Sequence, residues 1–121
     1  MQFNLENNNP HSIESYGEHS VKINAIEYSS NIIVHKHEVI AWEINLLSDL
    51  EQLPNLEMLL QYNPEIILLG QKICDTTRSC GFAQQFQQQN IAVEIMSIGA
   101  ACRTYNILLN EDRNVILGLI Y

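Results

Sequence analysis

The chain has 121 residues, the length of one domain, and 46% of them are hydrophobic, which is enough for a packed core. Six basic against fourteen acidic residues give a formal net charge of −8, which argues against a nucleic-acid partner because such binding depends on Lys and Arg contacts with phosphate. No apolar run approaches the ~18 residues of a membrane span, and the start resembles neither a signal nor a transit peptide. We therefore expect a cytoplasmic protein with at most peripheral membrane contact.

The N-terminal part is predicted to be a polar leader followed by an antiparallel β-meander. Residues 1–11 show no periodicity and are expected to be flexible, which places a single domain at 12–121. Residues 20–24 alternate between polar and apolar side chains, as a half-buried strand does. A turn at 24–25 follows, and we expect it to be wide or bulged because alanine fits a tight hairpin poorly. Two further strands are predicted at 31–35 and 38–42.

The second half is predicted to be a β-α-β-α-β unit preceded by a helix. Leucines at helical spacing, with Pro54 in the first turn, predict that helix, and Pro64 ends it. The continuous apolar runs at 65–70 and 91–96 are typical of strands buried on both faces. The remaining predicted elements are helices at 79–90 and 100–109 and a strand at 115–120. Right-handed crossovers then give a three-layer α/β domain with a mostly parallel sheet, to which the meander adds an antiparallel layer or edge.

Two loops of this unit, 70–78 and 97–100, are expected to face the same edge of the sheet. Ligands of open α/β sheets bind beyond the carboxyl ends of the strands, and each loop leads into a helix N-terminus, which favours an anion. The candidate ligand-binding residues are Gly70, Lys72, Thr76, Thr77, Arg78, Ser97, Arg103, Thr104, Tyr105 and Asn106. The alternative is that these groups only cap helices and offset neighbouring carboxylates. The sequence has neither a Walker loop nor a G-x-G-x-x-G motif, and no cofactor is predicted.

Cys102 is the candidate catalytic residue. It lies in the first turns of a predicted helix beside Arg103, and both features lower the pKa of a thiol. A nucleophilic or redox role requires an exposed sulfur, and the alternative is that Cys102 fills the core. Asn106 lies in the middle of the same helix, where asparagine is locally unfavourable. We therefore expect Asn106 to have a tertiary partner, such as the backbone of a neighbouring loop.

The other residues with chemical potential are explained more simply as structural. His35 and His37 would share a strand face and could form a metal pair, but their charged neighbours favour an exposed turn, and no metal is predicted. Cys74 and Cys80 are expected to be reduced thiols, with a disulfide between them as the alternative. Trp42, at the end of the third predicted strand, is expected to be a core residue.

Several segments occur in the order found in a known family of small α/β proteins. They are Tyr16-Gly17-Glu18, Ala41-Trp42, Asn63-Pro64-Glu65 before the run 66–70, residues 91–94, and Ala101-Cys102-Arg103-Thr104-Tyr105-Asn106-Ile107-Leu108. Over residues 12–120 the chain thus resembles the family that includes mitochondrial respiratory complex I assembly factor 3 and an adipogenesis-associated cytosolic protein. The last segment, which we call the helix motif (101–108), is the most specific element of the resemblance.

The resemblance implies a compact three-layer α/β domain for which no catalytic activity is established. It also implies a shared but unassigned role for the helix motif, and protein partners, which for the mitochondrial relative are those that build complex I. The chain departs from the family at Gln71 and Lys72, where relatives often have Thr-Gly. This departure lies inside the proposed anion loop, so it weakens the ligand hypothesis more than the fold.

Two functions from different classes follow as hypotheses. The first is a non-enzymatic accessory or assembly factor that acts through protein contacts, with a role related to respiratory complex I as the suggestion of the family. The alternative is a small-molecule protein, which binds an anion or is an enzyme, with its site between loop 70–78 and the start of the helix at 100–109. In that case Lys72, Arg78 and Arg103 would bind the anion.

Overall fold

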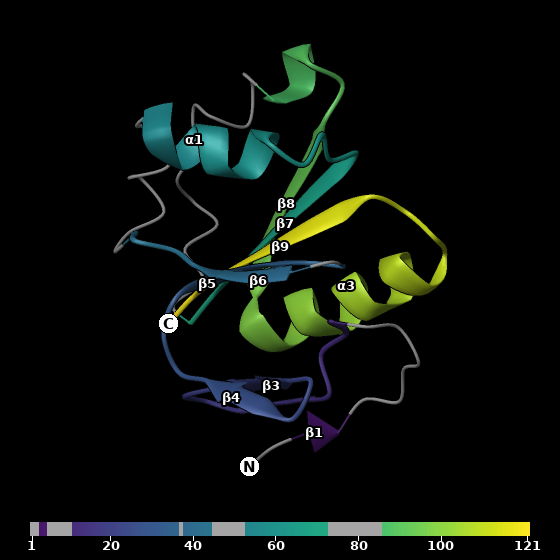
Figure 1. Ribbon diagram of the computed structural model, residues 1–121. Coiled ribbons are helices and arrows are strands. Elements are labelled where there is room, and N and C mark those ends of the chain that lie inside the picture. Colours follow the sequence, from purple (N-terminus) through teal and green to yellow (C-terminus); the bar gives the residue numbers. More distant parts are fainter. Residues whose placement is uncertain (1–2, 5–10, 37, 45–52, 73–85) are drawn as a thin grey trace.

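The computed structural model describes residues 3–4, 11–36, 38–44, 53–72 and 86–121, which form two β-sheets and the helices packed on them (Figure 1). The smaller sheet has the strand order β1-β2-β3-β4, and the larger sheet has the order β6-β5-β9-β7-β8. The strands of the smaller sheet are β1 (Phe3–Asn4), β2 (Ser15–Tyr16), β3 (Val21–Ile23) and β4 (Ile26–Tyr28). Those of the larger sheet are β5 (Ile32–His35), β6 (Glu38–Ala41), β7 (Ile66–Gln71), β8 (Ala92–Ser97) and β9 (Val115–Ile120). The labelled helices are α1 (Leu53–Leu60) and α3 (Ile98–Asn110).

The larger sheet is mixed, and this confirms the predicted α/β class. β7 pairs in parallel with β8 and β9, whereas β5 pairs antiparallel with β9 and β6. β7 has four consecutive buried residues because it has a strand on each side and a packed layer on each face. The predicted meander is divided between the sheets. β3 and β4 form a hairpin of the smaller sheet, whereas β5 and β6 extend the larger sheet antiparallel.

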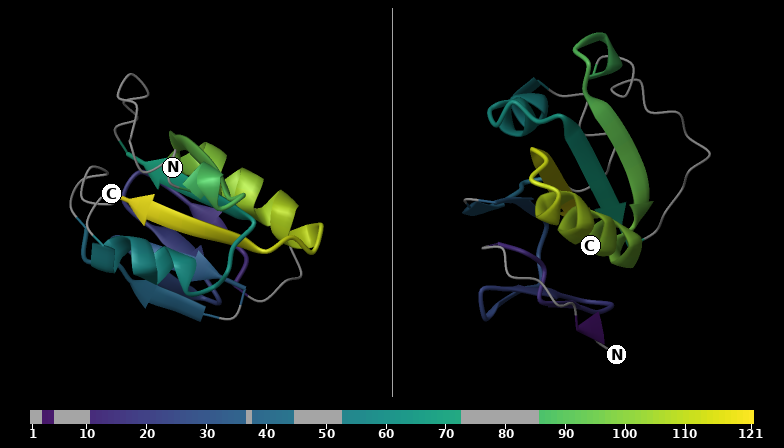
Figure 2. Two further views of the ribbon diagram at one scale, coloured as in Figure 1. Left: turned by 90° about the horizontal axis from the view of Figure 1, so that it is seen from above. Right: turned by 90° about the vertical axis from the view of Figure 1, so that its right-hand side faces the viewer.

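Helix α3 lies between the two sheets, and α1 covers the opposite face of the larger sheet (Figures 1 and 2). On the α3 side, one core joins Tyr105 of the helix to Val21 of the smaller sheet and Leu117 of the larger. On the other side, a second core contains Leu59 of α1 and Trp42, which is 3% exposed and is the core residue that was predicted. Because α3 is apolar toward both sheets, it is the element that holds them together.

The turn between β3 and β4 is tight, so the predicted wide or bulged turn is wrong. Ile23 pairs with Ile26, which leaves only Asn24 and Ala25 in the loop. Their φ angles are 51° and 64°, as in the two-residue turns whose twist matches that of the flanking strands. The N–H of Ala25 donates to Oε1 of Glu14 at 3.0 Å. This hydrogen bond supports a left-handed conformation that alanine adopts at a cost.

Strand β8 is an edge strand, so the prediction that both of its faces are buried is wrong. Its residues are exposed or half-buried and none is fully buried, and its one neighbour among the described strands is β7. At the other end of the chain, two residues of the predicted leader, Phe3–Asn4, pair with β2. The helix predicted at 79–90 is described only from residue 86 onward. Cys74 and Cys80 lie outside the described residues.

Candidate functional site

The carboxyl ends of β7 and β8 lie side by side, as predicted. Gly70 pairs with Met96, and Gln71 pairs with Ser97, in parallel register. Ser97 is also the N-cap of α3, and its Oγ accepts a hydrogen bond from the N–H of Ala100 at 3.4 Å. The N-terminus of α3 therefore opens on the edge of the sheet where a ligand was expected. Three predicted ligand-binding residues, Thr76, Thr77 and Arg78, lie outside the described residues.

A pocket of about 310 Å³ opens beside this helix N-terminus, and Gly17, Glu18, Lys72 and Ile98 line it. The backbone N–H of Lys72 donates to the carbonyl oxygen of Ile120 at 3.0 Å, which fixes the start of the loop against the end of β9. The side chain of Lys72 is exposed. Lys72 and the helix dipole favour an anion in this pocket, whereas the carboxylate of Glu18 offsets part of that field.

Arg103 contacts the smaller sheet and is not among the residues that line this pocket. Its Nη1 donates a hydrogen bond to the hydroxyl of Tyr16, and the guanidinium carbon lies 5.8 Å from the centroid of the Tyr16 ring. The same ring packs on the first turn of α3, because a Cβ at Gly99 would lie 2.8 Å from its Cε2. Arg103 thus joins the start of α3 to β2 while its side chain remains exposed.

Gly70 is required for packing and leaves no room for a ligand at its Cα. A Cβ at this position would lie 2.9 Å from Cβ of Ala101, 2.9 Å from Cδ2 of Leu119 and 3.2 Å from Cα of Ile98. These distances are shorter than van der Waals contact. The glycine therefore lets the first turn of α3 approach the backbone of β7, and this close approach explains why a glycine ends the apolar run.

The helix motif directs most of its functional groups into the core. Cys102 and Tyr105 are fully buried. The amide of Asn106 accepts from the N–H of Ile13 and donates to the carbonyl oxygen of Ile13, both at 2.9 Å. The hydroxyl of Thr104 donates at 2.8 Å to the carbonyl four residues earlier in the helix. The backbone partner predicted for Asn106 is therefore confirmed, and it is Ile13.

Burial decides the chemistry of Cys102. Desolvation raises the pKa of its thiol to about 12, and the positive charge of Arg103 lowers that pKa by a smaller amount. The thiolate is therefore scarce at neutral pH, and the exposed sulfur that a nucleophilic role requires is absent at this residue. Burial also raises the pKa of Tyr105, whose hydroxyl has no hydrogen-bond partner within the described part of the chain. The structure thus favours Cys102 as a core residue.

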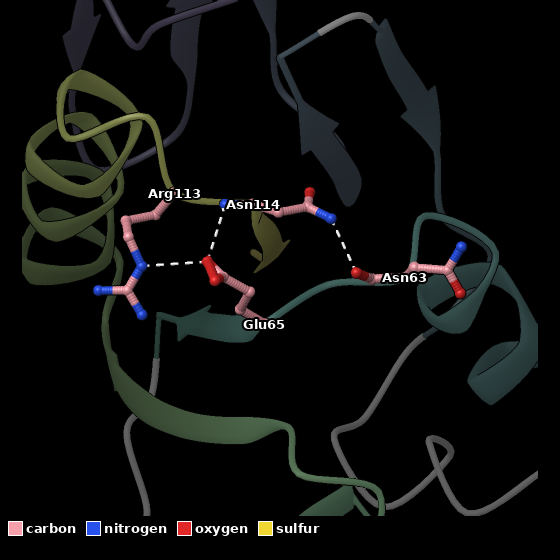
Figure 3. Close-up of polar contacts among 4 residues, drawn as sticks. All are labelled: Asn63, Glu65, Arg113 and Asn114. Carbon is pink, nitrogen blue, oxygen red and sulfur yellow. Dashed lines mark hydrogen bonds and ion pairs between the residues drawn. The ribbon is translucent and has the colours of Figure 1, made fainter.

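A second polar group, which sequence reasoning missed, lies at the start of β7; we call Asn63, Glu65, Arg113 and Asn114 the β7 joint (Figure 3). Oε2 of Glu65 accepts from Nε of Arg113 at 3.0 Å and from the N–H of Asn114 at 3.2 Å, and these bonds lower the pKa of the carboxyl. Nδ2 of Asn114 donates to the carbonyl oxygens of Asn63 at 2.7 Å and Tyr62 at 3.0 Å. The joint therefore holds the α1–β7 connection to the α3–β9 turn.

His35 connects the β7 joint to the larger sheet. It is 7% exposed, so the predicted exposed turn is wrong for this residue, while His37 lies outside the described residues. Its ring stacks on Tyr62 with centroids 4.6 Å apart, and its Nε2 lies 3.3 Å from Oδ1 of Asn114. Tyr62 donates its hydroxyl to the carboxylate of Glu38, and burial together with that carboxylate raises its pKa to about 12. These contacts link β5 and β6 to the segment that follows α1 and stabilise the fold.

Sequence reasoning also missed the contribution of the smaller sheet to the candidate site. Tyr16 is 87 positions from Arg103 in the chain, and Gly17 and Glu18 line the pocket beside α3. The available signal was the segment 16–18, which carries part of the family resemblance. The same segment thus contributes both to the resemblance and to the lining of the pocket.

The rest of the described structure has a further pocket, but neither a metal-binding cluster nor a membrane-spanning helix. A second pocket, of about 420 Å³, is lined by Ser30, Asn31, Ala41, Trp42, Glu43 and Ile44. Within the described ranges, no three His, Cys, Asp or Glu side chains are arranged to hold a metal ion. None of the helices in those ranges is both long enough and apolar enough to cross a membrane.

The chain is similar to known proteins over most of its length. A family model described as a protein of unknown function (DUF498/DUF598) matches residues 13–120. The 13 kDa major membrane protein of Francisella tularensis subsp. holarctica (strain LVS) is 30% identical over 95 residues, covering 77% of this chain and 76% of that protein. The Homo sapiens NADH dehydrogenase (ubiquinone) 1 alpha subcomplex assembly factor 3 is 28% identical over 109 residues, covering 89% of this chain but only 59% of that protein. An NMR structure of a Xanthomonas campestris protein superposes with a TM-score of 0.73 at 28% identity, covering 90% of this chain and 83% of that one.

Proposed function

This chain belongs to the DUF498 family of proteins of unknown function, and on that premise we propose that it is a non-enzymatic accessory factor that acts through protein–protein contacts. The observation that carries the proposal is the burial of the helix motif, in which Cys102, Tyr105 and Asn106 face the core between the two sheets. Residues buried in this way stabilise the fold, and binding to a partner would then involve residues at the surface. The name of the human relative, an assembly factor, favours the same class.

Within this class, we propose a role in the assembly of a respiratory complex related to complex I. The support is the name of the human relative, and the chain spans 59% of that protein, so only the matched part of it bears on this role. The partner would be a subunit of such a complex. The protein would meet it from the cytoplasm with at most peripheral membrane contact, and the Francisella relative is named a membrane protein.

Co-purification at native abundance tests this proposal. We expect a tagged chain, produced from its own promoter, to elute from a sizing column together with subunits of a membrane-associated complex. We also expect deletion of the chain to lower the amount of fully assembled complex on native gels. A chain that elutes alone at its working concentration, with complex assembly unchanged by its deletion, would contradict the proposal.

A second candidate function is the binding of a small anion in the pocket beside α3. The observation that favours it is the convergence of Lys72 and the N-terminus of α3, represented by Ile98, on one pocket. Phosphate and acetate should then raise the melting temperature of the wild type. The Lys72→Ala variant should lose this response, whereas Lys22→Ala, which removes an exposed lysine of β3, should keep it. If neither anion stabilises the wild type, this candidate fails.

A further inference from the structure

Among the strands that the structure describes, β8 has a partner on one side only, β7, and lies at the end of the larger sheet. Among the described strands that lie at sheet edges, β8 is the longest, with six residues, compared with two in β1, three in β4 and four in β6. In the right-hand view of Figure 2, β8 lies at the side of the sheet with β7 next to it. An edge of this kind presents backbone donors and acceptors to any extended chain that approaches it.

The register identifies which backbone groups face outward. The N–H of Ala92 donates to the carbonyl oxygen of Glu65 at 3.1 Å, so the backbone of Ala92 faces β7. Successive residues of a strand direct their backbone groups to opposite sides, and Glu94 therefore also faces β7. The N–H and C=O groups of Val93 and Ile95 face outward, and no described strand pairs with them there.

The edge lacks most of the features that normally prevent pairing with another strand. Proteins protect exposed edges with proline, lysine, bulges or very short strands. β8 contains neither proline nor lysine, and it pairs with β7 over six consecutive residues without a bulge. Its one charged residue is Glu94, whose side chain is exposed. The side chains of Val93 and Ile95 pack against the core on the α1 side, so their outward backbone groups are held in a fixed extended conformation.

We propose that the outer edge of β8 binds an extended segment of a partner protein, which adds a sixth strand to the larger sheet and places a basic residue beside Glu94. This inference rests on the proposed function, since it names the surface and the chemistry through which an accessory factor would hold its partner. Strand addition derives affinity from backbone hydrogen bonds, here to Val93 and Ile95. The net charge of −8 and the exposed carboxylate of Glu94 select a basic segment over an acidic one.

A second copy of this chain fits the edge poorly. Pairing two β8 strands antiparallel about a two-fold axis would bring Glu94 of each copy to the same face of the joined sheet, and like charges on neighbouring strands are destabilising. Each copy also carries a net charge of −8, which opposes association at low salt. The occupant that the charges favour is therefore a different protein.

Amide hydrogen exchange with two synthetic probe peptides tests the inference. One peptide alternates lysine with valine, and the other alternates glutamate with valine. We expect the lysine peptide to slow exchange at Val93 and Ile95 by about tenfold or more. Exchange at Glu94, whose N–H already faces β7, should stay unchanged, and the glutamate peptide should have no effect. Equal effects of both peptides, no effect of either, or protection that rises with protein concentration alone would each overturn the inference.

Two substitutions at Ile95 distinguish the contribution of its backbone N–H to peptide binding from that of its side chain. Ile95→Pro removes the outward N–H, which an edge strand tolerates, and Ile95→Ala removes a similar apolar contact but keeps that N–H. The lysine peptide should protect Val93 in Ile95→Ala but not in Ile95→Pro, and unchanged exchange at Leu117 in the core of the sheet would show that both variants fold. In the co-purification experiment, equal capture of complex subunits by both variants would show that the β8 edge is not the binding surface, while leaving the proposed function intact. If the wild type captures none, the proposed function fails whatever the peptides do.

Discussion

Asn106 of α3 and Ile13 are joined by two hydrogen bonds, each of 2.9 Å, although they are 93 positions apart in the chain. The side-chain amide accepts from the N–H of Ile13 and donates to its carbonyl oxygen. It therefore makes the two hydrogen bonds that a paired strand would make with this residue. Both residues are buried, and each of these polar groups would be costly without its partner. This pair ties the segment before β2 to the helix between the sheets.

Replacement of Asn106 by leucine should destabilise the protein strongly. The substitution keeps the approximate volume and improves helix propensity, but it leaves the N–H and C=O of Ile13 buried without these partners. We expect a loss of about 3 kcal/mol in the free energy of unfolding, measured by urea titration of Trp42 fluorescence. The reciprocal exchange at the exposed next position, Ile107→Asn, should cost less than about 1 kcal/mol. Similar losses for the two variants would show that helix propensity, and not the bond to Ile13, dominates.

Gly70→Ala should destabilise the contact between α3 and β7. The new Cβ would lie 2.9 Å from Cβ of Ala101, and we expect a cost of about 1–3 kcal/mol from the shift that this overlap forces. Ala101→Gly in the same chain removes one of the overlapping atoms and should recover part of the loss, because Leu119 and Ile98 still crowd the site. Thermal unfolding of the two single variants and the double variant measures this coupling. Strictly additive losses would mean that the contact with Ala101 is not the cause.

Cys102 should react slowly with alkylating reagents in the native protein. Burial raises its thiol pKa from an ordinary 9.0 to about 12, so the native thiolate fraction at neutral pH lies well below that of the unfolded chain. Mass spectrometry of the peptide that contains Cys102, after reaction with iodoacetamide with and without urea, measures the ratio. Equal rates in the two conditions would contradict the burial of this residue.

The same pKa shift predicts how stability changes at alkaline pH. The folded state holds the proton of Cys102 more tightly than the unfolded state does, so its contribution is complete below pH 9.0 and is lost as the pH rises toward about 12. Tyr62, whose pKa is raised from 10.0 to about 12, acts in the same direction. Urea midpoints measured above pH 9.0 should therefore fall less steeply in Cys102→Ala than in the wild type, and parallel curves would speak against the shift.

Asn114→Ala should destabilise the β7 joint more than Arg113→Ala does. The Asn114→Ala variant lacks the two hydrogen bonds that Asn114 donates to the carbonyl oxygens of Tyr62 and Asn63, and it also lacks the contact with His35. We therefore expect its free energy of unfolding, measured with urea, to fall by about 2 kcal/mol. The Arg113→Ala variant lacks only the surface ion pair with Glu65, and such a pair typically contributes less than about 1 kcal/mol. The reverse order of the two losses would show that the ion pair, and not the amide of Asn114, holds the joint.

Ala25→Gly should stabilise the β3–β4 hairpin. Ala25 has a φ of 64°, which glycine adopts without steric cost, and the sequence Asn-Gly is the preferred one for this turn. We expect a gain of about 0.5–1 kcal/mol, visible as a higher melting temperature. Ala25→Val, with a β-branched side chain at the same φ, should lower the melting temperature. A loss of stability in the glycine variant would mean that the turn is not strained.

Part of the candidate site could be predicted from the sequence. The adjacency of Gly70 and Ser97 follows from the right-handed crossover that joins two parallel strands, which is a rule about local chain direction. The partner of Arg103 could not be predicted in the same way, because Tyr16 reaches it from another sheet. For Cys102 the sequence left an exposed thiol and a core residue as alternatives, since a thiol near a helix start can face either the solvent or a layer packed above the helix.

The amino-acid sequence by itself determined which segments become strands and helices, because periodicity and apolar runs act within each segment: β7, β9 and α3 appear where the pattern predicts them. It also determined the α/β class, through the order of those segments. Only the tertiary structure decided which side chains of α3 are buried, that β8 lies at an edge, and that His35 is enclosed. These properties depend on contacts between residues far apart in the chain, such as Ile13 with Asn106, and no local pattern of residues records them.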